Sequence, residues 1–351
     1  MTDLELRVEP AASFEELRAD WSALAADARS VFQTWEWSST WWRHRGNDRT
    51  LLLRACRSPD GSLRVVLPLY LWRERPLRVA RFVGHDQGDE LGPVRGPGPP
   101  DVAARALSDE LKRLRLDVFL GEQLPGDERW PELLGARPWR LESSPTLRFA
   151  GGWDAFVAGR SANFREQVRR RERRLADRYR VEFRLASDAD RLDRDLDVLF
   201  ALHRDRWGPG SGFGPEPLHR EFARLALERG WLRLWVLELD GAPAAAWYGF
   251  RIGGVESYYQ AGRDSRFDAD SVGFVLLAHT VRAALEDGIE EYRFLRGPEA
   301  YKGRFANTDP GLESVAVAGS RLGAGVIEAG LAAKRVRTVL THRRFAARRT
   351  G

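Results

Sequence analysis

The stretch that decides the fold spans residues 232–262 and reads LRLWVLELDGAPAAAWYGFRIGGVESYYQAG. Two strand-like runs flank the turn Asp240-Gly241, which is typical of a β-hairpin. Residues 255–261 predict a third strand, residues 272–286 a helix, and residues 291–295 a further strand. A hairpin followed by a helix and another strand excludes a doubly wound dinucleotide-binding fold.

The first half of the chain repeats this order. Residues 51–57 and 63–72 predict a hairpin around the turn at Gly61, and residues 77–83 predict a third strand that runs into Gly84. The hairpin glycine and the strand-end glycine lie 23 residues apart here and 21 residues apart in the second half, at Gly241 and Gly262. Matching order and spacing predict duplication of one mixed α/β unit.

We therefore expect a first lobe at residues 1–150, a second lobe at 151–318 and a basic extension at 319–351. An arginine-rich helix at residues 164–180 opens the second lobe. Phe164, Val168, Arg171/Glu172 and Leu175 share one side of that helix. Its arginines, Arg170 among them, form either a solvated face or a cationic ridge over a phosphate-bearing ligand. The extension either makes no specific contact or touches RNA or a membrane surface.

Composition excludes several classes of protein. The chain has 351 residues, 43% of them hydrophobic, and no apolar run approaches the roughly 20 residues of a membrane-spanning helix. The single cysteine, Cys56, excludes a disulfide framework and a thiolate zinc cage. The first ten residues are acidic and lack an apolar segment, which predicts a cytoplasmic protein. The six histidines are scattered, so no metal is expected. Nucleotide-binding glycine loops and a serine-hydrolase elbow are also absent.

The charge points to an anionic partner. The formal net charge is +5, which suits CoA, a nucleotide-linked sugar, tRNA or an anionic membrane, and DNA is not expected. Among 56 basic residues only Lys112, Lys302 and Lys334 are lysines. A GC-rich genome, in which arginine codons replace lysine codons, explains this bias. In such a background a lysine is a candidate for a position that requires a compact ammonium group.

Several strings in the second half form a recognisable set. They are WYGFR at 247–251, YYQAGRD at 258–264, SVG at 271–273 and YRFLRGPEAYK at 292–302. This set resembles the GNAT-like acyltransferases of the CelD cellulose-biosynthesis type, which are related to the Fem peptidyltransferases. The first half also fits, through FQTW at 32–35 and PL at 68–69, so the resemblance covers residues 5–318.

The resemblance implies an α+β fold of two tandem GNAT-like lobes, whose mixed, largely antiparallel sheets are flanked by helices. It also implies N-acyl transfer from acyl-CoA, acetyl-CoA first among the candidates, to an amine of a sugar, amino acid or envelope precursor. The usual pyrophosphate-binding loop is missing here. The helix start at Ser271, Val272 and Gly273 replaces it, because free N–H groups at a helix N-terminus bind phosphate.

Four residues are candidates for catalysis. The Fem-like pattern places Lys302 where it neutralises phosphate or oxyanion charge. Tyr301 either supplies a phenolic proton or packs in the core. Asp264 either orients and deprotonates the amine or only stabilises its own turn. His203 is either a general base or a cation at a helix C-terminus.

Further residues are candidates for substrate binding. Tyr259 and Gln260 are neighbours on one strand, so we expect only one of them to line the cleft. Arg263 and Trp35 complete this group, although a tryptophan at position 35 also suits the core. His85-Asp86 mirrors Arg263-Asp264 in the other lobe, either as an acceptor-side pair or as a remnant of the repeat.

Two rival functions remain. The first keeps the fold and takes aminoacyl-tRNA as donor, as the Fem enzymes do. The sequence has no long heptad run for a coiled-coil arm, which argues against this alternative. The basic helix and the basic extension favour it. The second rival is a non-catalytic polysaccharide or envelope assembly factor that keeps a degenerate transferase cleft.

Overall fold

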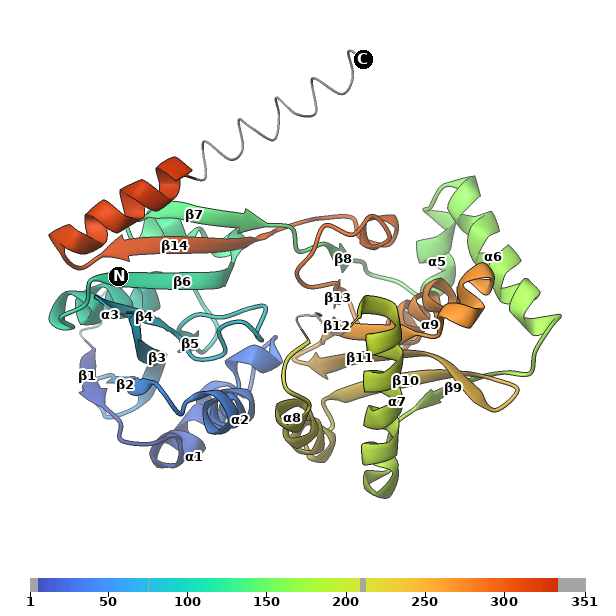
Figure 1. Cartoon of the computed structure of the whole chain (residues 1–351), viewed down its shortest axis with the longest axis horizontal. Coiled ribbons are helices and arrows are strands. Elements are labelled where there is room, and N and C mark those ends of the chain that lie inside the picture. Colours follow the sequence, from blue (N-terminus) through green and yellow to red (C-terminus); the bar gives the residue numbers. More distant parts are fainter. Residues whose placement is uncertain (1–5, 75, 209–212, 334–351) are drawn as a thin grey trace, which may run out of the picture.

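Two β-sheets, each with its own helices, form the molecule in a computed structural model that describes residues 6–74, 76–208 and 213–333 (Figure 1). The first sheet has the strand order β1-β2-β3-β4-β6-β14-β7, with β5 paired to β3. Its strands are β1 Arg7–Pro10, β2 Thr50–Arg57, β3 Leu63–Glu74, β4 Leu77–Phe82, β5 Val94–Arg95, β6 Val118–Pro125, β7 Arg137–Glu142 and β14 Leu312–Ala318.

The second sheet has the order β8-β13-β12-β11-β10-β9 and is largely antiparallel, because only β12 and β13 run parallel. Its hairpin turns at Asp240-Gly241, as the opening stretch of sequence predicts. The strands are β8 Thr146–Arg148, β9 Val181–Leu185, β10 Leu232–Leu239, β11 Ala242–Ile252, β12 Val255–Arg263 and β13 Glu291–Arg293.

Helices flank both sheets, and the predicted α+β class is confirmed. In the first lobe the helices are α1 Phe14–Leu24, α2 Trp35–Arg45, α3 Asp101–Arg113 and α4 Trp130–Leu133. In the second they are α5 Trp153–Ala158, α6 Ala162–Ala176, α7 Ala189–Trp207, α8 Glu216–Glu228 and α9 Val272–Glu286. No helix of the described residues is both long and apolar enough to cross a membrane.

Serine and threonine caps start the first two helices. The Ser13 hydroxyl accepts the Glu16 N–H at 3.3 Å, and the Thr34 hydroxyl accepts the Trp37 N–H at 3.2 Å. The capping box at Ser13 and Glu16 and the apolar pattern predict a helix through Ala28, but α1 ends at Leu24. The residues that follow pack against the β11–β12 turn, where a Cβ on Gly253 would lie 2.3 Å from the Ala28 carbonyl oxygen.

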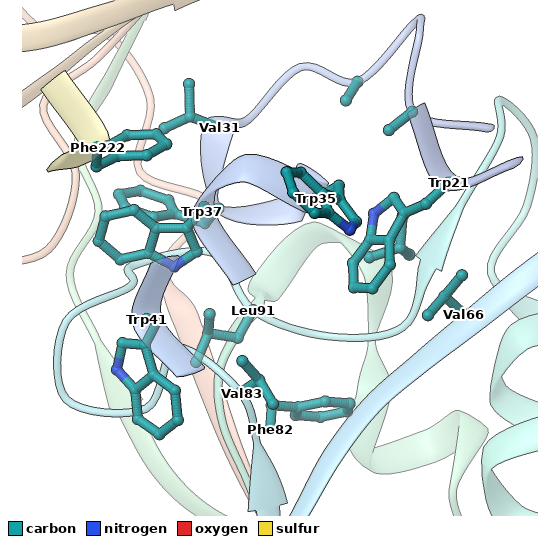
Figure 2. Packing of buried hydrophobic residues seen from close by; sticks show 14 of the residues in the cluster. Trp21, Val31, Trp35, Trp37, Trp41, Val66, Phe82, Val83, Leu91 and Phe222 are labelled. Atoms are coloured by element: carbon teal, nitrogen blue, oxygen red, sulfur yellow. The ribbon is translucent and has the colours of Figure 1, made fainter. Parts of the chain in front are cut away.

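The two lobes exchange strands, and one hydrophobic cluster contains residues of both. Strand β14 lies between β6 and β7 of the first sheet, although the predicted division places residues 312–318 in the second lobe. Strand β8, expected in the first lobe, pairs with β13 instead. Trp37 of α2 packs edge-on against Phe222 of α8, with 4.9 Å between ring centroids (Figure 2). This packing holds the two lobes in one relative position.

Candidate functional site

Two cavities meet on strand β12. The smaller, here called the loop cavity, has a volume of about 110 Å³, and the larger, here called the sheet cavity, about 300 Å³. Tyr258, Ala261 and Tyr301 line both. The loop cavity is otherwise lined by Asp86, Gln87, Asp89, Trp207, Tyr259, Gln260, Phe294, Arg296, Glu299 and Lys302.

The loop cavity opens where two parallel strands separate. Strands β12 and β13 pair only from residues 255–257 to residues 291–293, and the cavity is lined by residues beyond that pairing. A bulge in β12 adds to the opening, because Tyr248 and Gly249 pair with Gln260 and Tyr258 and leave Tyr259 as the extra residue.

This bulge corrects one expectation. Regular alternation predicts that only one of Tyr259 and Gln260 lines the cleft. Both residues line the loop cavity, because a bulge interrupts the alternation of side chains along the strand.

A loop of the first lobe, residues 84–92, forms one wall of the loop cavity. The Tyr259 hydroxyl donates to the Gln87 carbonyl at 2.7 Å, and the Gly214 N–H donates to the Gln87 side chain at 3.0 Å. The Arg296 N–H donates to Asp89 Oδ2 at 3.2 Å. These bonds place Asp86 and Asp89 in a cavity whose remaining wall comes from the second lobe.

Three carboxylates and two cations set the charge of the loop cavity. Burial raises the pKa of Asp89, although the Arg296 guanidinium lies 3.5 Å away. Asp86 is about half exposed, and Glu299 pairs with Lys302 at 3.0 Å. An acidic pocket with one poorly solvated carboxylate suits a cationic amine.

Lys302 holds the loop that carries it. Its ammonium donates to the carbonyls of Leu295 and Arg296 at 3.3 and 2.6 Å and to Glu299, so all three N–H groups are used. Burial lowers the pKa of Lys302. The turn that it ties together is tight, because Leu295 has a φ of 54° and a Cβ on Gly297 would lie 2.2 Å from Glu299 Oε2.

Tyr301 lies where the two cavities meet. Its hydroxyl donates to the Tyr258 hydroxyl at 3.2 Å, and the Arg206 guanidinium lies 5.8 Å from the centre of its ring. Burial raises the pKa of Tyr301 well above its ordinary value. The phenol therefore stays protonated near pH 7 and can act only as a hydrogen-bond donor or in a step that returns a proton to it.

The sheet cavity is cationic around an apolar wall. Trp247, Phe274 and Leu277 contribute that wall, whereas the charged lining residues are four arginines and one acid, namely Arg171, Arg206, Arg263, Arg304 and Asp268. The Arg171 guanidinium lies 4.4 Å above the Phe274 ring. Burial lowers the pKa of Arg171, and the nearby Arg304 and Arg170 lower it further. Such a cluster favours an anionic ligand.

The N-terminus of α9 opens into the sheet cavity. Ser271 and Gly273 both line it. Arg263, predicted with the substrate-binding residues, lines this cavity instead and pairs with Asp268 at 2.6 Å. Ser271 has a φ of 61° and makes no side-chain cap bond. The first N–H groups of α9 therefore lack the side-chain acceptor that caps α1 and α2.

His203 lies behind the loop cavity. Its Nε2 is 3.3 Å from Gln260 Oε1, and burial lowers its pKa to about 4. With its pKa lowered, the ring is neutral near pH 7, which does not favour a cation at the end of α7, and the role of general base stays a prediction. The contact with Gln260 makes His203 a residue that orients part of the cavity wall.

Four predicted residues lie away from both cavities. Asp264 caps the turn Ser265–Asp270 and pairs with Arg266, its nearest nitrogen at 2.6 Å. Trp35 is a core residue, and its indole donates to the Phe14 carbonyl at 2.7 Å. Val272 is fully buried, and Arg170 is exposed on α6. The geometry therefore supports the structural alternatives for Asp264 and Trp35, and it gives no support to a binding or catalytic role for any of the four.

The sequence contained signals for some residues that were missed. Helical spacing already placed Arg171 on the side of Phe164 and Val168, so Arg171 rather than Arg170 was the better candidate. Asp86 was expected either in an acceptor-side pair or as a remnant of the repeat, and it lines the loop cavity. Tyr258 stands beside the chosen Tyr259, and the bulge that exposes both has no sequence signal of its own.

Comparisons with known proteins agree with this geometry. Residues 162–303 match a family model described as an acetyltransferase (GNAT) domain, which is less than half of the chain. No curated protein sequence matches the chain.

Solved structures share the fold over nearly the whole chain. FemX is 11% identical, with 89% of this chain and 97% of that chain covered and a TM-score of 0.63. L-PGS from Bacillus licheniformis is 12% identical, with coverages of 91% and 95% and a TM-score of 0.55. A tandem GNAT protein from the clavulanic acid biosynthesis pathway is 15% identical, with coverages of 90% and 99% and a TM-score of 0.50.

At these identities the structural neighbours show a common fold. The family match over residues 162–303 supports a transferase enzyme, and the solved structures show the two-lobed fold in which that domain lies.

Proposed function

We propose that this chain is an N-acyltransferase that takes its donor in the sheet cavity and its amine acceptor in the loop cavity. The observation that carries the proposal is the meeting of a cationic cavity and an acidic cavity at Tyr258, Ala261 and Tyr301. A reaction between an anionic donor and a cationic acceptor needs this arrangement of opposite charges around one contact point.

A CoA thioester is the proposed donor. Arg171, Arg263 and the start of α9 supply positive charge and backbone N–H groups for its phosphates. The apolar wall near Trp247 and Phe274 suits the pantetheine arm. A cavity of about 300 Å³ holds that arm and the acyl group, with the nucleotide at the rim.

Asp86 and Asp89 are proposed to receive the acceptor amine as an ammonium ion. The raised pKa of Asp89 makes its carboxylate the better base of the two. After Asp89 takes the proton, the amine nitrogen attacks the acyl carbonyl carbon, so a C–N bond forms and the C–S bond breaks. Tyr301 then gives its proton to the leaving thiolate and receives the second proton that the nitrogen loses on becoming an amide, so no phenolate remains.

Lys302 fits this scheme as a positioning residue. It fastens the turn that precedes Tyr301 and keeps positive charge beside the loop cavity. Gln260, held by His203, is proposed to contact the acceptor. The predicted role of Lys302 against oxyanion charge stays a proposal. For that role Lys302 must give up one of its three bonds to the protein.

A Fem-type aminoacyl-tRNA donor is the second candidate. The likeness to FemX and to L-PGS favours it, as do the exposed arginines of α6. The basic extension that was also expected to bear on this choice lies, from residue 334 onward, outside the described residues. Binding of tRNA would be strongly salt-dependent.

Calorimetric titration with acetyl-CoA, longer acyl-CoAs and free CoA at two salt concentrations separates the two donors. We expect micromolar binding of a thioester, weakened in Arg171→Gln. Absence of binding to every thioester, together with salt-sensitive binding of charged tRNA, would contradict the CoA proposal.

Tyr301→Phe tests the proton donor. We expect kcat to fall about 100-fold with little change in KM, which is the usual size of a general-acid contribution. Tyr179→Phe is the matched control, because its hydroxyl bonds to Asp270 away from both cavities. Equal kinetics for the two variants would remove Tyr301 from the mechanism.

A further inference from the structure

A third and larger cavity lies between the lobes. Its volume is about 700 Å³, and its walls come from the loop after α1, the end of β6, and strands β8 and β13. No aromatic side chain lines it, so it offers no surface on which a nucleobase could stack. We call it the interlobe cavity.

A thin partition separates the interlobe cavity from the loop cavity. Glu90 lines the interlobe cavity and receives two bonds of 3.0 Å from Arg293. The preceding residue, Asp89, lines the loop cavity with Arg296. Successive residues of one loop therefore face two different cavities, and the interlobe cavity is distinct from the proposed reaction site.

Three arginines converge on one buried carboxylate in the interlobe cavity. Glu291 lies 2.7 Å from a nitrogen of Arg293, 2.7 Å from Arg29 and 3.6 Å from Arg148. Burial alone would raise the pKa of Glu291, but these arginines outweigh that effect and lower it. The side chains of Arg29 and Arg148 are about half exposed, so both keep N–H groups free for a ligand.

Most of the other charged groups of the cavity are paired. Glu128 pairs with Arg95 at 2.7 Å, and Glu90 pairs with Arg293. Asp127 lies 3.3 Å from Arg148 on the exposed side, and Asp27 also lines the wall. Asp127 is thus the carboxylate that competes most directly with a ligand for Arg148.

A buried hydroxyl adds a second, independent observation. Ser30 is 3% exposed and lines the interlobe cavity, yet its Oγ has no hydrogen-bond partner within the described part of the chain. A buried polar atom without a partner costs free energy, which a bound ligand would recover.

We propose that the interlobe cavity is a second ligand site that takes an oxyanion, either carboxylate or phosphate, on a polar non-aromatic ligand. Arg29 and Arg148 bind the anion, and Ser30 donates or accepts a hydrogen bond beside it. A cavity of this volume holds a ligand of ordinary metabolite size. The proposal does not depend on acyl transfer.

Calorimetric titration at constant ionic strength tests the site with citrate as the carboxylate probe, inorganic pyrophosphate as the phosphate probe and sorbitol as the neutral probe. We expect citrate or pyrophosphate to bind and sorbitol not to bind. Arg148→Gln should weaken the binding about tenfold, and Asp127→Asn should strengthen it, because the exposed Asp127 no longer competes for Arg148.

Two control variants locate the binding. Arg224→Gln removes an arginine of similar exposure that pairs with Asp193, and neither residue lines the interlobe cavity. This variant should leave the binding of both anions unchanged. Arg171→Gln reports on the sheet cavity, which also attracts anions. No binding of either anion, a loss confined to Arg171→Gln, or changes of the same sign in Arg148→Gln and Asp127→Asn would each overturn the proposal.

Discussion

The two lobes share a topology, but only one of them is open. In the first lobe β4 pairs in parallel with β6 over three residues, 79–81 with 118–120. In the second lobe β12 pairs in the same way with β13, 255–257 with 291–293. A long helix separates the two strands of each pair along the chain. Beyond that pairing the second lobe opens into the loop cavity. The first lobe is filled by its own loop, in which the Leu91 N–H donates to the Gln123 carbonyl at 2.9 Å.

The corresponding helices also begin differently. Helix α3 carries Asp101 in its first turn, whereas α9 has no acidic residue there and faces a cluster of arginines. The first lobe thus neutralises its own helix N-terminus, and the second leaves one available to an anion. Both lobes therefore have the common fold, but the binding geometry is found in the second. The loop at residues 84–92, which fills the first lobe, also forms a wall of the loop cavity in the second.

One buried histidine in each lobe should respond to acid, and the two should respond in opposite ways. Burial lowers the pKa of His219 to about 3, and neither of its ring nitrogens has a partner in the described structure. Because the unfolded state binds its proton near pH 6.5, His219 destabilises the fold as the pH falls below that value. At about pH 4.5 the loss is about 2–3 kcal/mol.

His85 should behave in the opposite way. Burial would lower its pKa, but hydrogen bonds from the ring to Asp86 and Glu122 outweigh burial and raise it. Its contribution is therefore full below about pH 6.5 and disappears as the pH rises through the folded pKa. Urea unfolding against pH checks both: His219→Leu should gain most in acid, and His85→Gln should lose most in acid. Parallel pH profiles for both variants would contradict this.

Gly273→Asp should make α9 resemble α3. The new carboxylate would lie next to Arg263, whose Cδ is 3.5 Å from a Cβ at this position. It would repel donor phosphates and weaken acyl-CoA binding about 30-fold, or about 2 kcal/mol. Gly273→Asn has the same shape without the charge and should cost much less in calorimetric titration. Equal losses in both variants would indicate a steric effect instead.

Neighbouring arginines on α6 allow a sharper comparison. Arg171 lines the sheet cavity, and Arg170 is exposed on another side of the helix. Arg171→Gln should weaken acyl-CoA binding about fivefold to tenfold, as loss of one charge-assisted contact does. Arg170→Gln should leave the Kd nearly unchanged. A larger effect at Arg170 would mean that the anion lies outside the sheet cavity.

The smallest expected effect concerns the caps. Thr34→Ala removes the cap of α2 and should lower the free energy of unfolding by about 1 kcal/mol. Ser271→Ala removes a side chain that makes no cap bond and should cost less. Urea unfolding measures both, and a larger loss at Ser271 would show that its hydroxyl already stabilises α9.

Local patterns predicted the repeated elements well. Strand β10 and helix α9 have the bounds that alternation, the Asp240-Gly241 turn and Asp287-Gly288 indicate. These features depend on neighbouring residues in the chain, so one sequence is enough to find them.

The site was harder to predict, because it depends on contacts between distant segments. Nothing near Asp89 in the chain shows that Tyr259 holds its loop across the lobe boundary. The rarity of lysine correctly drew attention to Lys302, which is buried and central to its turn, but it did not reveal that its ammonium bonds to backbone carbonyls. Likewise, Trp35 bonds to Phe14 and Asp264 pairs with Arg266. Neither partner belongs to the sequence motifs that carry the resemblance.

The placement of β14 has a consequence for synthesis of the chain. Strand β14 pairs with β6 on one side and β7 on the other, so it joins the first sheet near one end of its order. During translation, β6 and β7 emerge long before residues 312–318 and expose unpaired edges to other nascent chains. The lobe that is made first is thus completed last, and stalled or truncated products should aggregate through those edges.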